Sequence, residues 1–154
     1  MIKHIWTVLA QKAIIESQSN SLSLIDVMEE LTVTISKKAP KDLKIATINI
    51  PISYEVVSYL LKDSKNNEDN PLIRIQILNP KGKIMKSFEH LVAWEKGKER
   101  MRTRAHIMGL NVDLPGNYIF RIYLKEKIED EYSQVAEIPL KVKIQELSPV
   151  AAKK

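Results

Sequence analysis

The sequence has 154 residues, of which 44% are hydrophobic and 28% charged, a composition ordinary for a globular protein of one domain. It contains no cysteine, which excludes disulfides, thiolate nucleophiles and cysteine-ligated metals, and neither glycine-rich phosphate-loop motif occurs. The formal net charge of +5 is mild, so it permits an anionic partner without requiring one.

The apolar run at residues 5–10 is the only feature near the start that is similar to a targeting segment. It is shorter than the apolar region of a secretory signal, and no stretch approaches the roughly 20 apolar residues of a membrane-spanning helix. We therefore expect a cytoplasmic protein, with a single domain over residues 1–148 and a disordered basic tail at 149–154.

The first strand is predicted at residues 5–15, which are rich in β-branched and aromatic side chains. A polar turn follows at 16–21, where Asn20 can adopt left-handed backbone geometry. Residues 22–35 are ambiguous, because their first half has the spacing of a short helix and their second half alternates like a strand. We favour a strand paired with the first one, and a short helix at 22–31 stays open.

Alternating apolar residues predict further strands at 44–61, 72–78, 84–92 and 100–112. Pro51 cannot donate a hydrogen bond to a neighbouring strand, so it marks an edge position or a bend. The Pro/Gly-containing stretch 79–83 predicts a hairpin turn. Polar loops are expected at 37–42, 63–70 and 93–99.

The clearest pattern is the last third of the chain, residues 110–144. Two strict alternations flank a charged loop, so both are half-buried strands that form an antiparallel hairpin. Phe120 and Ile138 lie on its predicted apolar faces, and Lys141 lies on the opposite face. A Pro115-Gly116 turn precedes the first of these strands.

Strands that recur every 10–18 residues with hairpin-like turns predict an all-β protein. We expect a single antiparallel β-sandwich of about eight strands. The alternative is a small β-barrel, because the pattern does not say whether the two sheets close.

Three segments carry a resemblance to a known family. The sequence resembles an uncharacterised bacterial β-sandwich family, C2-like or immunoglobulin-like, which implies that fold and no activity or site. The matching segments are Trp6-Thr7-Val8-Leu9 with Lys12, Ser21-Leu22-Ser23-Leu24, and Pro115-Gly116-Asn117-Tyr118-Ile119-Phe120-Arg121.

The candidate binding residues are the basic side chains of residues 96–104, namely Lys96, Lys98, Arg100, Arg102 and Arg104. In a strand the three arginines share one face at intervals of about 7 Å, so they could contact successive phosphates or carboxylates. The alternative is a solvated face that protects a sheet edge and pairs with acids such as those at 126–131. No aromatic residues interleave with the basic ones in the sequence; only Trp94, expected to be more exposed than Trp6, lies near.

The sequence contains no motif for metal binding or catalysis. Acidic loops at 63–70 and 126–131 could share one end of the sandwich and offer oxygens to a cation, but no D-x-D pattern occurs. His4, His90 and His106 are isolated from one another, and no nucleophile motif is present. We therefore expect no metal, no cofactor and no catalysis.

The composition and patterns favour a non-enzymatic module that binds an unknown protein partner or has a structural role. The alternative function is binding of an anionic partner, nucleic acid or acidic lipid, through the face formed by Arg100, Arg102 and Arg104.

Overall fold

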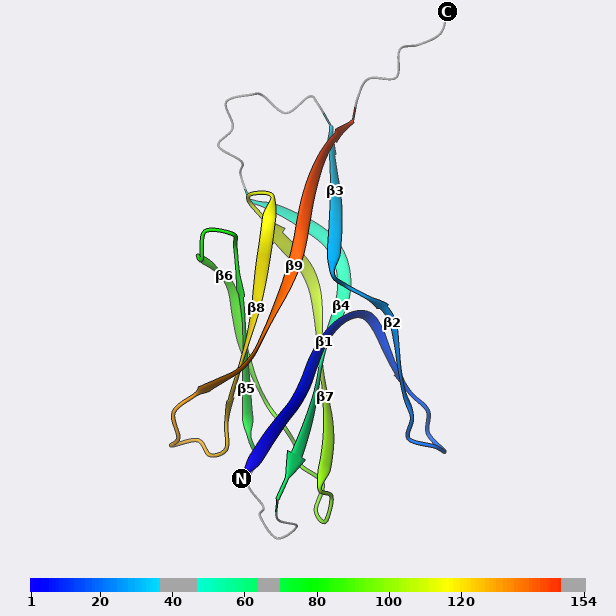
Figure 1. The fold of residues 1–154 in the computed structure, drawn as a ribbon, viewed down its shortest axis with the longest axis vertical. Helices are drawn as coiled ribbons and strands as arrows, with labels where there is room; N and C mark the ends of the chain where they lie inside the picture. The colour runs from blue at the N-terminus through cyan, green and yellow to red at the C-terminus, as the bar shows by residue number, and fades with distance from the viewer. Residues whose placement is uncertain (37–46, 64–69, 148–154) are drawn as a thin grey trace, which may run out of the picture.

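The structure, a computed structural model, describes residues 1–36, 47–63 and 70–147, and these form an all-β fold (Figure 1). Three predicted segments lie outside the described residues: the loop at 37–42, most of the acidic loop at 63–70 and the tail at 149–154. The strands of the described part are β1 (Ile2–Ile15), β2 (Leu22–Val27), β3 (Glu30–Ser36), β4 (Ile48–Lys62), β5 (Leu72–Leu78), β6 (Ile84–Leu91), β7 (Arg100–Val112), β8 (Gly116–Lys125) and β9 (Ser133–Leu147).

The strands form two separate sheets, which confirms the sandwich. One sheet has the order β2-β1-β4-β7 and the other the order β3-β9-β8-β5-β6. All pairs are antiparallel except one: β3 runs parallel to β9, with Val33 opposite Ile144. The prediction of antiparallel pairing throughout is therefore wrong at this pair, which joins two strands far apart in the sequence.

The ambiguous segment at 22–35 is strand and not helix. It divides into β2 and β3, which belong to different sheets, and this division brings the described strands to nine instead of about eight. Near the end of β2, Asp26 has a positive φ of 50°. Just after β2, the Met28 N–H donates to the Leu9 carbonyl of β1 at 2.8 Å, and the chain then crosses to the other sheet. Only β2 is the predicted partner of the first strand.

The C-terminal hairpin has the predicted apolar and exposed faces. Phe120 lies opposite Ile138, and Tyr118 lies opposite Leu140. Phe120 and Tyr118 are fully buried, whereas Lys141 is exposed. The bend predicted at Pro51 is also present, as a shift in the β4–β7 register between Ile50 and Ser53.

Tyr118 makes the turn before β8 into a recognisable corner. Its hydroxyl lies 2.9 Å from the Leu114 carbonyl oxygen, to which it donates, and accepts from the Asp113 N–H at 2.9 Å. A tyrosine near the start of strand F that bonds back to the backbone a few residues upstream is a feature of immunoglobulin-like domains. The strand pairing agrees, because β1, β4 and β7 lie in the order A-B-E and β9, β8 and β5 in the order G-F-C. The fold is an immunoglobulin-like sandwich.

The two sheets contact each other through an aromatic pair at their centre. Antibody domains carry a cysteine two residues after the corner tyrosine, and it bridges to strand B. In this chain the position is Phe120, whose ring meets that of Tyr54 on β4 edge-on, with centroids 6.0 Å apart. Edge-to-face contact is a favourable geometry for two aromatic rings. Burial raises the pKa of Tyr54 far above its usual range, which keeps the hydroxyl neutral.

The β1–β2 hairpin positions the candidate site. Beyond Ala10, β1 leaves β4 and pairs only with β2. The end of β1 bends over and returns as the hairpin (Figure 1). Its turn contacts β7 through the hydrogen bond from Arg102 to the Asn20 carbonyl. Glu55 on β4 accepts a hydrogen bond from the Ala13 N–H, which attaches the bend to the sheet.

The part of the chain that the structure describes contains no helix long and apolar enough to cross a membrane.

Candidate functional site

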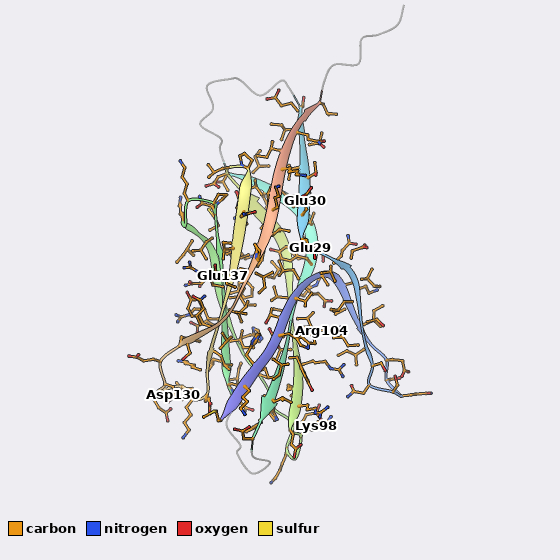
Figure 2. The ribbon with its side chains drawn as sticks, in the orientation of Figure 1. Glu29, Glu30, Lys98, Arg104, Asp130 and Glu137 are labelled. Atoms are coloured by element: carbon orange, nitrogen blue, oxygen red, sulfur yellow. The ribbon has the colours of Figure 1, made fainter. Side chains whose placement is uncertain are left out.

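The three arginines of β7 lie on the outer side of the four-stranded sheet, as predicted. Thr103 between them is buried, with 8% exposed, and Met101 and Ala105 pack against the core. The basic positions run along β7 from Lys98 in the loop before it to Arg104 beside the bend of β1 (Figure 2).

Two of these arginines are used to hold the β1–β2 hairpin. Arg102 Nη2 donates to both the carbonyl oxygen and the side-chain oxygen of Asn20, each at 2.6 Å. Arg104 Nη1 donates to the Ala13 carbonyl at 2.9 Å. Charged donors make stronger hydrogen bonds than neutral ones, so these contacts fix the turn over the sheet.

The turn is built to present Asn20 in this position. Asn20 has a positive φ of 57°, the left-handed geometry expected for it. Glu16 closes the turn by accepting hydrogen bonds from the backbone of Gln18 and Ser19. Together with the Ser19 hydroxyl, the largest cause, these donors lower the pKa of Glu16 to about 2.

Arg100 differs from its neighbours, because no hydrogen bond or ion pair within the described residues holds its guanidinium group. The lysines of the preceding loop have partners: Lys98 pairs with Glu95, and Lys96 also interacts with another group. Within the described ranges, none of the three β7 arginines pairs with a carboxylate. Of the acids at 126–131, which the sequence offered as partners, Glu126 accepts from the Ile2 N–H and Asp130 from the Lys127 N–H. Among the described residues of this row, Arg100 is therefore the cation that is free to bind a ligand.

The reason for the missing ion pairs is the strand opposite. Arg100, Arg102 and Arg104 face Leu61, Tyr59 and Val57 of β4. Directly opposite residues are the ones that interact across a sheet, and none of these three can neutralise a guanidinium group.

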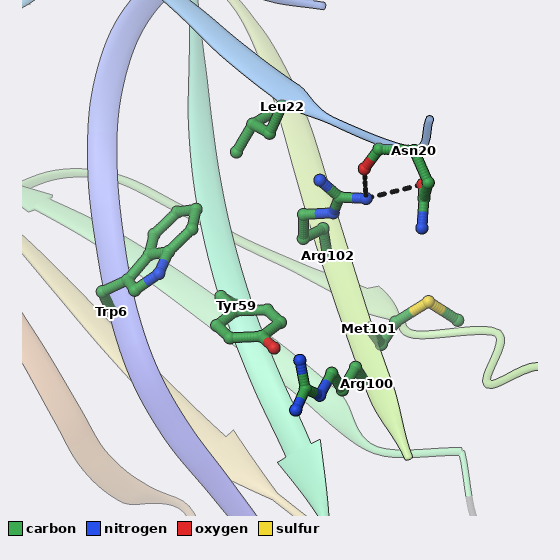
Figure 3. Close-up of a pocket in the computed structure, with 7 residues that line it drawn as sticks. All are labelled: Trp6, Asn20, Leu22, Tyr59, Arg100, Met101 and Arg102. Atoms are coloured by element: carbon green, nitrogen blue, oxygen red, sulfur yellow. Dashed lines mark hydrogen bonds between the residues drawn. The ribbon is translucent and has the colours of Figure 1, made fainter. Parts of the chain in front are cut away.

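Arg100 and Arg102 line a hollow of ≈ 300 Å³ between the sheet and the hairpin (Figure 3). Trp6 and Tyr59 form its wall on the sheet side, with ring centroids 5.6 Å apart and planes tilted by 35°. A second hollow of ≈ 290 Å³, lined by Lys98, Gly97 and Glu99, shares Arg100 and Asn20 with the first. We call the two hollows together the hairpin groove.

The aromatic wall is a feature that the sequence does not predict. The sequence predicts core or interface positions for both Trp6 and Trp94, with Trp94 the more exposed. Both are half-buried, and of the two only Trp94 packs against the core cluster. Tyr59 lies opposite both Trp6 and Arg102, so the three side chains form one row across β1, β4 and β7. Aromatic residues thus accompany the arginines across the sheet and not along the chain.

The histidines do not form a site. His4 Nε2 lies 2.7 Å from the Thr7 hydroxyl, and Thr7 in turn bonds to Ser58 on the inner side of the sheet. His106 Nε2 lies 3.2 Å from the Ser53 hydroxyl. His90 is largely buried, and burial lowers its pKa. Among the described residues there is no group of three or more metal-ligating side chains; Glu68 and Asp69 lie outside this part.

No family model matches the sequence, and no curated protein matches it. Among solved structures, the chain is similar to the C-terminal domain of wzt, with 11% identity over 96% of this chain and 75% of that chain, and a TM-score of 0.49. It is also similar to an immunoglobulin-like protein (PA1606) from Pseudomonas aeruginosa, with 12% identity over 93% of this chain and 97% of that chain, and a TM-score of 0.43. Neither likeness bears on function. Of the two folds that the resemblance implies, C2-like and immunoglobulin-like, the sheet order and the tyrosine corner described above show the second.

Proposed function

We propose that this protein is a non-enzymatic, cytoplasmic binding module that holds an anionic partner in the hairpin groove. Of the two functions expected from the sequence, the geometry favours the anionic partner over a general protein-interaction or structural role. A protein partner fits the same proposal only through an acidic segment.

The observation that carries the proposal is Arg100. Its guanidinium group lies between the two hollows without a partner among the described residues, while the neighbouring Arg102 is held by Asn20. A guanidinium group presents several donors in a planar fork that matches carboxylate and phosphate oxygens. Because the hairpin is already fixed in place, a ligand would not have to bear the entropic cost of ordering it.

The first hollow of the hairpin groove offers donors and aromatic rings for binding and, among the residues that the structure describes there, no group for proton transfer. The described residues around its first hollow are Trp6, Asn20, Leu22, Tyr59, Arg100, Met101 and Arg102. None of these side chains is a carboxylate, an imidazole or a thiol, the groups that usually act as general bases or nucleophiles near neutral pH.

The test compares two arginines. Three polyanions are used: polyglutamate, an oligonucleotide and vesicles of anionic phospholipid. Each is titrated against the wild type, Arg100→Gln and Arg121→Gln, at about 50 and about 200 mM salt. Arg121 is the matched control, because it also faces outward but binds Glu137, with 3.0 Å between Nε and Oε2. We expect at least one polyanion to bind, with an affinity that falls with salt and is weakened by Arg100→Gln alone.

Two outcomes would contradict the proposal. One is a wild type that binds none of the polyanions at low salt, where electrostatic attraction is strongest. The other is an equal loss of binding in the two arginine variants, which would show that overall charge and not the hairpin groove attracts the ligand.

A further inference from the structure

We infer that the anionic partner is single-stranded nucleic acid, with one base against the Trp6–Tyr59 wall and a neighbouring phosphate on Arg100. The inference rests on the proposed function, whose site it shares, and it adds the class of ligand.

The positions of the groups carry the inference. Trp6, Tyr59 and Arg102 lie side by side across three strands, and Arg100 follows Arg102 two residues along β7 on the same face. Two residues along a strand span about 7 Å, so a planar group on the rings and an anion on Arg100 would be near neighbours. In Figure 3 the Arg100 guanidinium group points back toward the hydroxyl of Tyr59.

The size and chemistry of the hollow fit one base. Its volume of ≈ 300 Å³ is at the lower end of the range for small-ligand sites, about 300–1,000 Å³. Proteins that bind single strands combine a basic groove for the backbone with aromatic rings for the bases. The pI of ≈ 9.3 agrees with the basic balance of nucleic-acid-binding domains.

Other polyanions use only part of this arrangement. Glutamate side chains would satisfy Arg100 but leave the half-buried rings of Trp6 and Tyr59 without a planar partner. In a duplex the bases are stacked on one another, so they could reach the rings only after unpairing, which costs a few kcal/mol. A nucleotide of a single strand brings an accessible base and a phosphate in one repeating unit.

The test measures binding of labelled oligothymidylate about ten residues long, within the about 4–16 nucleotides typical of single-strand sites. An abasic oligomer of the same length, a duplex and polyglutamate serve as competitors. The variants are Tyr59→Leu, Arg100→Gln and, as a matched aromatic control, Tyr123→Leu, since Tyr123 is a half-buried tyrosine on the outer side of the other sheet.

We expect Tyr59→Leu to weaken oligothymidylate binding by about 5- to 150-fold, the equivalent of about 1–3 kcal/mol for stacking one base. Binding of the abasic oligomer should not change in this variant. Arg100→Gln should weaken both ligands and reduce the slope of log affinity against log salt by about 0.7. Tyr123→Leu should bind like the wild type. Because Arg100 is exposed, its variant reports on the site even if Tyr59→Leu does not fold.

The failures of the two proposals are distinguishable. If polyglutamate or the abasic oligomer binds as tightly as oligothymidylate through Arg100, the nucleic-acid inference is wrong and the proposed function stands. If the duplex binds more tightly than the single strand, the inference is also wrong. If no polyanion binds, both are wrong.

Discussion

The two outer faces of the sandwich both carry arginines, but they use them differently. On the five-stranded sheet, Arg74 lies directly opposite Glu89, with 2.6 Å between Nη2 and Oε1, and Arg121 lies directly opposite Glu137. On the four-stranded sheet the residues opposite the arginines are apolar or aromatic. The residue across the strand therefore decides whether an arginine pairs with a carboxylate of the same sheet. Of the described arginines without such a partner, Arg102 and Arg104 hold the hairpin, and Arg100 is available to a ligand.

The largest effect should come from the core on which both faces rest. Phe120→Ala removes a fully buried ring that packs against Tyr54, and we expect a loss of about 3–5 kcal/mol in the free energy of unfolding. Lys141→Ala on the exposed side of the next strand should cost less than about 0.5 kcal/mol. Urea unfolding measures both values. Equal losses would mean that the register of β8 and β9 is wrong.

A smaller effect should distinguish the arginine that holds the hairpin. Arg102→Gln removes two hydrogen bonds to Asn20, and we expect a loss of about 1 kcal/mol together with faster amide exchange in the β1–β2 hairpin. Arg121→Gln, which breaks an exposed ion pair, should cost about 0–1 kcal/mol and leave exchange in the hairpin unchanged. Unchanged exchange in Arg102→Gln would refute its role in holding the turn.

Removing the carboxylates that pair with arginines on the five-stranded sheet should make that face bind anions in place of the four-stranded one. In an Arg100→Gln background, Glu89→Gln with Glu137→Gln removes the carboxylate partners of Arg74 and Arg121. Arg74 keeps its contact with the Tyr132 ring, whose centroid lies 3.9 Å from Cζ. We expect the variant to gain salt-dependent binding of polyanions, with a slope corresponding to up to about two contacts. Stability should fall by less than about 1 kcal/mol for each exposed pair. If no binding is gained, missing ion pairs do not explain the difference between the faces.

The smallest effect concerns the pH range over which the turn keeps its shape. The pKa of Glu16 is about 2 in the folded state, below its ordinary value of 4.5. A depressed carboxyl pKa contributes stability that is present above the ordinary value and is lost as the pH falls toward the folded value. The protection of the Gln18 and Ser19 amides, measured as their exchange rate relative to a free peptide at the same pH, should therefore be lost between pH 4.5 and about 2. In Glu16→Gln this protection should be absent throughout, and a pH-dependent loss of protection in that variant would contradict the assignment.

The local features of the fold could be predicted because they depend on neighbouring residues. The alternation around Phe120 and around Ile138 predicts the buried faces of the hairpin. The structure places these two residues opposite each other, in strands that are adjacent in the sequence. The parallel pairing of β3 with β9 could not be predicted, because it joins opposite ends of the chain.

The candidate site was predictable only in part, for the same reason. Period-two spacing placed Arg100, Arg102 and Arg104 on one face, and the structure keeps them there. Their aromatic neighbours depend on two long-range registers, those of β1 with β4 and of β4 with β7. The use of Arg102 to hold Asn20 depends further on how the hairpin bends, and no pattern in the sequence encodes that bend.

The contact between Tyr54 and Phe120 has a mechanical consequence. Where a covalent bridge joins the two sheets, a pulling force cannot extend the chain between the bridged positions. In this chain the link is a contact between two rings, and it carries no load once the rings separate. Stretching should therefore release the whole segment from β4 to β8 to its full length, equally in oxidising and in reducing buffer. A single-molecule extension curve should be the same with and without dithiothreitol.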